Sequence, residues 1–186
     1  MELLASPYEF FHETVTAAIR TQQLTVSEGA AFYLVNLLCE FTKTRTDAEP
    51  LSLKLVRAPE LSLEQQAQTL REIGDQSLYM SGLFPEHLTR RMMDVEFYID
   101  LGGMAYHQLS GMARATSAGL RAVFTELARQ FSCFVALLRE LRPRLGINPA
   151  TDLPSLYEQW RKTGSSWLAE RLRACGVILP SRPIRQ

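Results

Sequence analysis

The chain is poor in the residues that most often carry chemistry. Its 186 residues include three cysteines and three histidines. The cysteines, Cys39, Cys133 and Cys175, lie far apart in no metal-binding spacing, and their number is odd. This excludes a disulfide scaffold and favours thiols that serve as small hydrophobic side chains in a reducing compartment. The sequence also lacks a Gly-rich phosphate loop and a nucleophile elbow, so we predict no cofactor.

An excess of charge and a long apolar run are missing as well. The 20 basic residues balance the 20 acidic ones, whereas proteins that grip phosphates are usually basic, which makes nucleic acid an unfavoured partner. The most apolar stretch, residues 29–39, is far shorter than the ~20 residues of a membrane span. The acidic N-terminus does not have the pattern of a signal peptide. We therefore expect a cytoplasmic protein without membrane contact.

Apolar residues recur at helical spacing along most of the chain. Together with capping residues, they predict helices over residues 7–22, 28–43, 63–81, 95–115, 117–141, 152–162 and 166–175, while residues 51–58 could add one or two turns. No window alternates like a strand, and no period of 20–50 residues repeats. The predicted fold is all-α, a single-domain bundle of about seven helices over residues 1–176 with a disordered tail over residues 177–186. The helix over 28–43 or the helix over 117–141 should lie at its centre.

Gly74 interrupts the inward stripe of the helix over residues 63–81. A glycine in mid-helix costs about 1 kcal/mol relative to alanine. We expect the close approach of another helix to compensate, with Gly74 or Ser77 opposite Gly102 or Ala105.

Potential metal ligands occur on two helices without forming a convincing site. Glu9 and His12 have the Glu-x-x-His spacing of di-iron bundles, but the required second copy is missing. We therefore predict no metal.

The helix over residues 95–115 has a polar side made by Glu96, Asp100, His107 and Arg114. Asp100 and His107 lie ~10.5 Å apart along the helix axis, too far to converge easily on one ion. This side is opposite the apolar stripe and should face water. Gly103, Met104 and Gly111 share it and could accept a second helix or a ligand.

The most unusual segment runs from residue 71 to residue 98. Arg71, Asp75 and Tyr79 are spaced four apart, so an ion pair and a phenol can share one helix side. Arg90, Arg91 and Tyr98 follow after a short turn. We take Asp75, Tyr79, Arg90, Arg91 and Tyr98 as the candidate site and expect at least one of the two arginines to pair with Asp75. The corner can bind an anion, or it can be a structural network that fixes the turn.

Several short stretches carry a resemblance to known sequences. Residues 32–38 (FYLVNLL), 70–75 (LREIGD) and 81–84 (SGLF), with Tyr98 and residues 105–106, resemble a group of uncharacterised proteobacterial proteins of similar length. The resemblance covers roughly residues 8–110. It implies a bacterial, intracellular origin and carries over no activity and no catalytic residues.

Two functions follow from these observations as the main alternatives. The first is a non-enzymatic interaction or regulatory protein that binds a protein partner or forms a homodimer. The second is a helical sensor domain that binds a small anionic molecule at the candidate site. An enzyme whose site is assembled from several helices stays open as a third.

Overall fold

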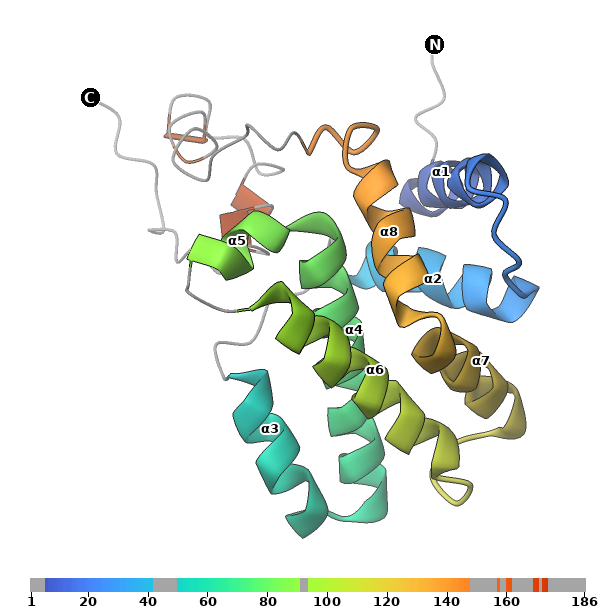
Figure 1. Ribbon diagram of the computed structural model, residues 1–186, viewed down its shortest axis with the longest axis vertical. Helices are drawn as coiled ribbons and strands as arrows, with labels where there is room; N and C mark the ends of the chain where they lie inside the picture. Colours follow the sequence, from blue (N-terminus) through green and yellow to red (C-terminus); the bar gives the residue numbers. More distant parts are fainter. Residues whose placement is uncertain are drawn as a thin grey trace.

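The computed structural model describes residues 6–41, 50–90, 94–147 and several positions between 157 and 173. Within these residues all regular structure is helical, which confirms the predicted all-α bundle (Figure 1). The elements are α1 (Pro7–Thr21), α2 (Glu28–Phe41), α3 (Leu51–Arg57), the 3-10 turn η1 (Ala58–Glu60), α4 (Leu63–Leu83), α5 (Pro85–Arg90), α6 (Val95–Gly111), α7 (Ala118–Arg129) and α8 (Phe131–Leu141). The predicted helices over 152–162 and 166–175 fall mainly outside the described residues, and the predicted tail over 177–186 falls wholly outside them.

Two helices begin at capping boxes that the sequence encodes. The Ser6 hydroxyl accepts a hydrogen bond from the Glu9 backbone N–H at 3.2 Å, and the Glu9 carboxylate accepts one from the Ser6 N–H at 2.8 Å. Ser62 and Gln65 repeat this arrangement at the start of α4. Because backbone N–H groups in the first turn have no partner within the helix, such boxes define where a helix starts.

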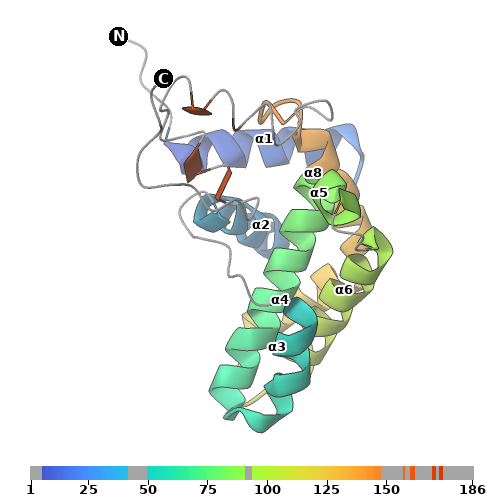
Figure 2. The same ribbon diagram turned by 90° about the vertical axis from the view of Figure 1, so that its left-hand side faces the viewer.

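The centre of the bundle is α4, and our prediction of a different central helix is wrong. Helices α3, α5, α6 and α8 all pack on α4, while α1 and α2 pair at one end of the molecule (Figures 1 and 2). Every residue from 77 to 84 is buried. This stretch includes Ser77, Ser81 and Gly82, which a search for large apolar side chains does not count as core. The predicted burial of Leu34 and Leu38 in α2 is nevertheless confirmed.

Small residues set the close approach of helices to α4. A Cβ atom on Gly102 would lie 2.7 Å from the Cβ of Ser77, so the predicted contact between these two positions is confirmed. A Cβ atom on Gly82 would lie 2.6 Å from the Cβ of Leu138 in α8. Gly82 therefore packs inside α4, which extends to Leu83, beyond the predicted end at residue 81. These positions leave no room for a side chain.

The predicted helix over residues 117–141 is interrupted at Gln130, which separates α7 from α8. Helix α7 packs on α6 and α2, whereas α8 packs chiefly on α4. One straight helix could not follow both surfaces, and Figure 1 shows the change of direction between them. None of the described helices combines the length and the apolar character needed to cross a bilayer.

Candidate functional site

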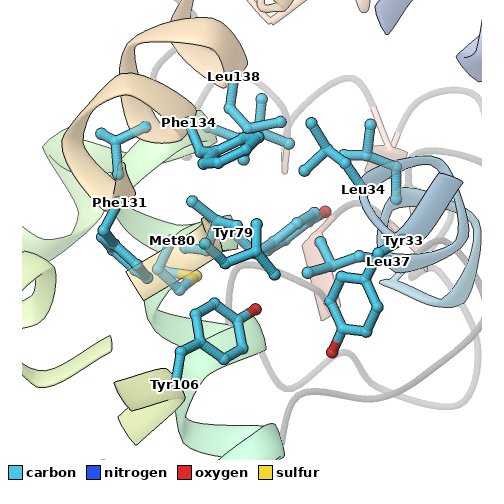
Figure 3. Packing of buried hydrophobic residues seen from close by; sticks show 14 of the residues in the cluster. Tyr33, Leu34, Leu37, Tyr79, Met80, Tyr106, Phe131, Phe134 and Leu138 are labelled. Atoms are coloured by element: carbon cyan, nitrogen blue, oxygen red, sulfur yellow. The ribbon is translucent and has the colours of Figure 1, made fainter. Parts of the chain in front are cut away.

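One carboxylate links three helices in the interior of the bundle. Asp75 on α4 accepts hydrogen bonds at its Oδ1 from the hydroxyl of Tyr33 on α2, at 2.6 Å, and of Tyr106 on α6, at 2.7 Å. The Nε of Arg71 lies 3.6 Å from Oδ2 of Asp75 and donates to the Tyr33 hydroxyl at 3.1 Å. We call these four residues the Asp75 cluster. Figure 3 shows the rings of Tyr33 and Tyr106 converging from their two helices.

The Tyr106 ring is held in place from several sides. It is fully buried and stacks on Phe124, with ring centroids 5.6 Å apart, and it also touches Phe131. A Cβ atom on Gly74 would lie 2.6 Å from Cδ1 of this ring. Gly74 is therefore a packing glycine, as predicted, but it faces an aromatic ring instead of Gly102 or Ala105. The missing side chain at residue 74 makes the space through which Tyr106 reaches Asp75.

Burial dominates the electrostatics of the Asp75 cluster. It raises the pKa of Asp75, and the two tyrosine hydroxyls and Arg71 oppose this effect only in part. Burial and the neighbouring carboxylate raise the pKa of both Tyr33 and Tyr106, which stay neutral hydrogen-bond donors. The Asp75 side chain is 19% exposed, and its own chain supplies donors or a cation to both oxygens. A carboxylate satisfied in this way is typical of a structural network.

The residues of the predicted site do not all gather around Asp75. The Arg71–Asp75 pair is present as the sequence indicates. The buried Tyr79 ring stacks on Phe41, with centroids 4.2 Å apart. Tyr98 is half-buried on α6 beside Phe97.

The predicted pairing of Asp75 with an arginine of the following turn stays a prediction. Helix α5 ends at Arg90, whose side chain lies outside the described residues, as does the whole of Arg91.

Tyr33 and Tyr106 were not predicted as partners of Asp75. A usable signal was present, because a tyrosine on the buried stripe of an apolar helix needs a hydrogen-bond partner for its hydroxyl. Asp75 is the nearby acceptor on the inward side of α4. Within the described residues, no three His, Cys, Asp or Glu side chains lie close enough to hold a metal ion.

A second candidate lies on the outward side of α6. Phe97, Asp100, Met104, His107 and Gly111 follow one another at alternating spacings of three and four residues, so they form one straight seam. All five are exposed, as predicted for the polar members, with Phe97 at 50% and Met104 at 43%. We call this seam the outer α6 face.

The polar side chains of the outer α6 face have no partner among the residues that the structure describes. The side chains of Asp100 and His107 form neither a hydrogen bond nor an ion pair within the described part of the chain, and the same is true of Glu96. Figure 2 shows α6 along an outer edge of the bundle, and in Figure 1 the same helix crosses the middle of the view in front of α4. Unpaired charges flanking exposed apolar side chains are typical of a contact surface.

Another set of exposed apolar side chains lies on α3, but the charged side chains beside it have partners. Val56 is 73% exposed and Leu53 is also exposed. The neighbouring charged side chains already have partners, however: Lys54 lies 3.3 Å from Glu72, and Arg57 also has one. The outer α6 face is therefore the better candidate for specific recognition.

Comparison of the chain with protein-family models, curated proteins and solved structures gave no match. The resemblance to uncharacterised proteobacterial proteins stays a prediction, and function has to be argued from the residues themselves.

Proposed function

We propose that this chain is a non-enzymatic interaction protein, intracellular and of bacterial type, that binds a protein partner through the outer α6 face. The observation that carries the proposal is the seam of Phe97 and Met104 interleaved with the unpaired Asp100 and His107. Aromatic and methionine side chains are enriched at protein interfaces, and unpaired charges beside them can select a partner.

The structural role of the Asp75 cluster supports the proposal of a non-enzymatic protein. It is the most perturbed set of titratable groups among the described residues, and perturbed groups are the first place to look for catalysis. Here the carboxylate is bound by Tyr33, Tyr106 and Arg71 of the same chain. A general base must be free to take a proton from a substrate, so this arrangement favours a structural role.

Site-specific photo-crosslinking tests the proposal directly. A photoreactive phenylalanine analogue replaces Phe97, and the full chain is irradiated in cells of its own host. We expect a cross-linked protein product of defined mass. The matched control carries the analogue at Phe10, an exposed phenylalanine of α1 at 42% exposure, and should give no such product. If Phe97 yields no product, or the same products as Phe10, the outer α6 face is not a recognition surface.

A second candidate function rests on Arg71. Its Nε is engaged by Tyr33 and Asp75, while its terminal nitrogens donate no hydrogen bond within the described residues, and its side chain is 47% exposed. A guanidinium group oriented in this way can bind a small anion. Titration with inorganic phosphate should then show binding that is lost in Arg71→Gln. Binding should be kept in Arg114→Gln, because the exposed side chain of Arg114 lies in the loop after α6. Equal behaviour of the two variants would exclude this ligand site.

A further inference from the structure

We infer that the partner of the outer α6 face is a second copy of this chain, bound antiparallel across a two-fold axis that passes midway between Gly103 and Met104. The inference rests on the proposed function and names its partner. A two-fold interface brings one surface against itself, so every group on it must find its complement elsewhere on the same surface. The outer α6 face meets this requirement in charge and in shape.

Asp100 and His107 are complementary to each other across the proposed two-fold axis. They are seven residues apart on the same side of α6, about 10.5 Å along the axis, and the proposed two-fold axis lies halfway between them. In an antiparallel pair, Asp100 of each copy is therefore level with His107 of the other copy. The imidazole N–H can donate to the carboxylate at both ends of the contact. A parallel pair would instead place the two Asp100 side chains together, which like-charge repulsion disfavours.

A pair of opposite charges extends this pattern. Glu96 lies near the start of α6, and Arg114 lies just past its end. Both side chains are exposed, and neither has a hydrogen-bond or ion-pair partner among the described residues, apart from backbone capping. Antiparallel pairing brings Glu96 of one copy towards Arg114 of the other. The two ends of the surface are thus complementary to each other, which steers the antiparallel arrangement.

The large apolar residues of this face lie opposite glycines in the antiparallel pair. Gly103 is half-buried next to the exposed Met104 and carries no side chain, and the atoms nearest to its Cβ position belong to Phe131 and Ala128, 3.7 and 3.9 Å away. Antiparallel pairing places Met104 of each copy at Gly103 of the other. Phe97 similarly comes close to Gly111 of the second copy, where no atom lies within 4 Å of a Cβ position. Each large side chain therefore meets a glycine, and small residues at the crossing let two helices approach closely.

The test is the oligomeric state of a charge-swapped pair of variants. Sedimentation velocity of the full chain at low salt, over a wide range of concentration, should show a dimer. Asp100→His and His107→Asp should each weaken the dimer by at least about tenfold, since each places like groups opposite one another at both ends. The double variant Asp100→His/His107→Asp should restore it. Restoration requires that the two residues face each other between copies, which a different partner protein would not provide.

A shape variant gives an independent readout with a matched control. Gly111→Leu should be tolerated by the fold, because no atom lies within 4 Å of its Cβ position, but it should crowd Phe97 of the second copy and weaken the dimer. Gly119→Leu on α7, where no atom lies within 4 Å, should leave the dimer unchanged. Circular dichroism melting checks that each variant is folded.

The outcomes separate this inference from the proposed function. A chain that stays monomeric, while the analogue at Phe97 cross-links to a different protein, refutes the second copy and leaves the proposed function in place. A monomer without any cross-link at Phe97 refutes both. A dimer that is indifferent to the charge swap and to Gly111→Leu uses another surface and overturns the inference.

Discussion

Replacing Gly74 by alanine should displace the ring of Tyr106 from its position beside Asp75. The new Cβ would lie 2.6 Å from Cδ1 of the ring and 2.9 Å from Cζ, both well inside van der Waals contact. The ring cannot retreat easily, because it is fully buried and stacked on Phe124. The Tyr106 hydroxyl donates to Asp75 at 2.7 Å, so even a small rotation of the ring lengthens this hydrogen bond.

The expected size of the effect follows from three contributions. Alanine favours a helix over glycine by about 1 kcal/mol. Overpacking costs about 1 to 3 kcal/mol, and a weakened hydrogen bond to a charged group costs up to about 3 kcal/mol. Gly74→Ala should therefore lower the free energy of unfolding by up to about 5 kcal/mol in total.

The assay is urea unfolding followed by circular dichroism, with the free energy taken from the midpoint and slope. A double-mutant cycle with Tyr106→Phe isolates the hydrogen bond, because phenylalanine keeps the ring and lacks the hydroxyl. Gly74→Ala should cost less in the Tyr106→Phe background than in the wild type. Gly119→Ala is the matched control: nothing lies near its Cβ, so it should be neutral or slightly stabilising.

Two results would refute this reasoning. If Gly74→Ala stabilises the protein as much as Gly119→Ala does, the ring is not fixed against α4. If its cost is the same with and without the Tyr106 hydroxyl, the ring moves without disturbing Asp75, and Gly74 does not support the Asp75 cluster.

Three further predictions concern stability. Burial raises the folded-state pKa of Asp75 above the ordinary value of 3.8, so the folded state binds this proton more tightly than the unfolded state does. The wild type should therefore lose stability relative to Asp75→Asn as the pH rises from about 4 through the raised pKa. A constant difference in the free energy of urea unfolding across that range would contradict this. Glu86→Gln should lower the free energy of unfolding by about 1 kcal/mol, since both oxygens of Glu86 accept hydrogen bonds from Nη2 of the buried Arg142, each at 2.8 Å; an unchanged urea midpoint would show that this ion pair adds nothing. Ser6→Ala removes the capping box with Glu9 and should cost about 1 kcal/mol, seen as a lower thermal midpoint, whereas an unchanged midpoint would mean that the start of α1 frays in the native protein.

The local features of this protein could be predicted from its sequence. The helix starts at residues 7 and 63, the Arg71–Asp75 ion pair and the exposure of Asp100 and His107 were all predicted correctly. Each depends on residues three or four apart or on the side of one helix, and helical geometry fixes those relations without reference to the rest of the chain.

The tertiary structure alone decided what completes the Asp75 cluster and which helix is central. Tyr33 and Tyr106 lie 42 and 31 residues from Asp75 along the chain, on two other helices. Which side chains meet across such distances depends on how the helices are rotated and spaced, and here small residues such as Gly74 and Gly102 set that spacing. A hydropathy pattern shows where apolar side chains recur. It does not show where a glycine leaves space for a side chain of another helix. For this reason the sequence predicted the helices, and packing against α4 determined the partners of its buried carboxylate.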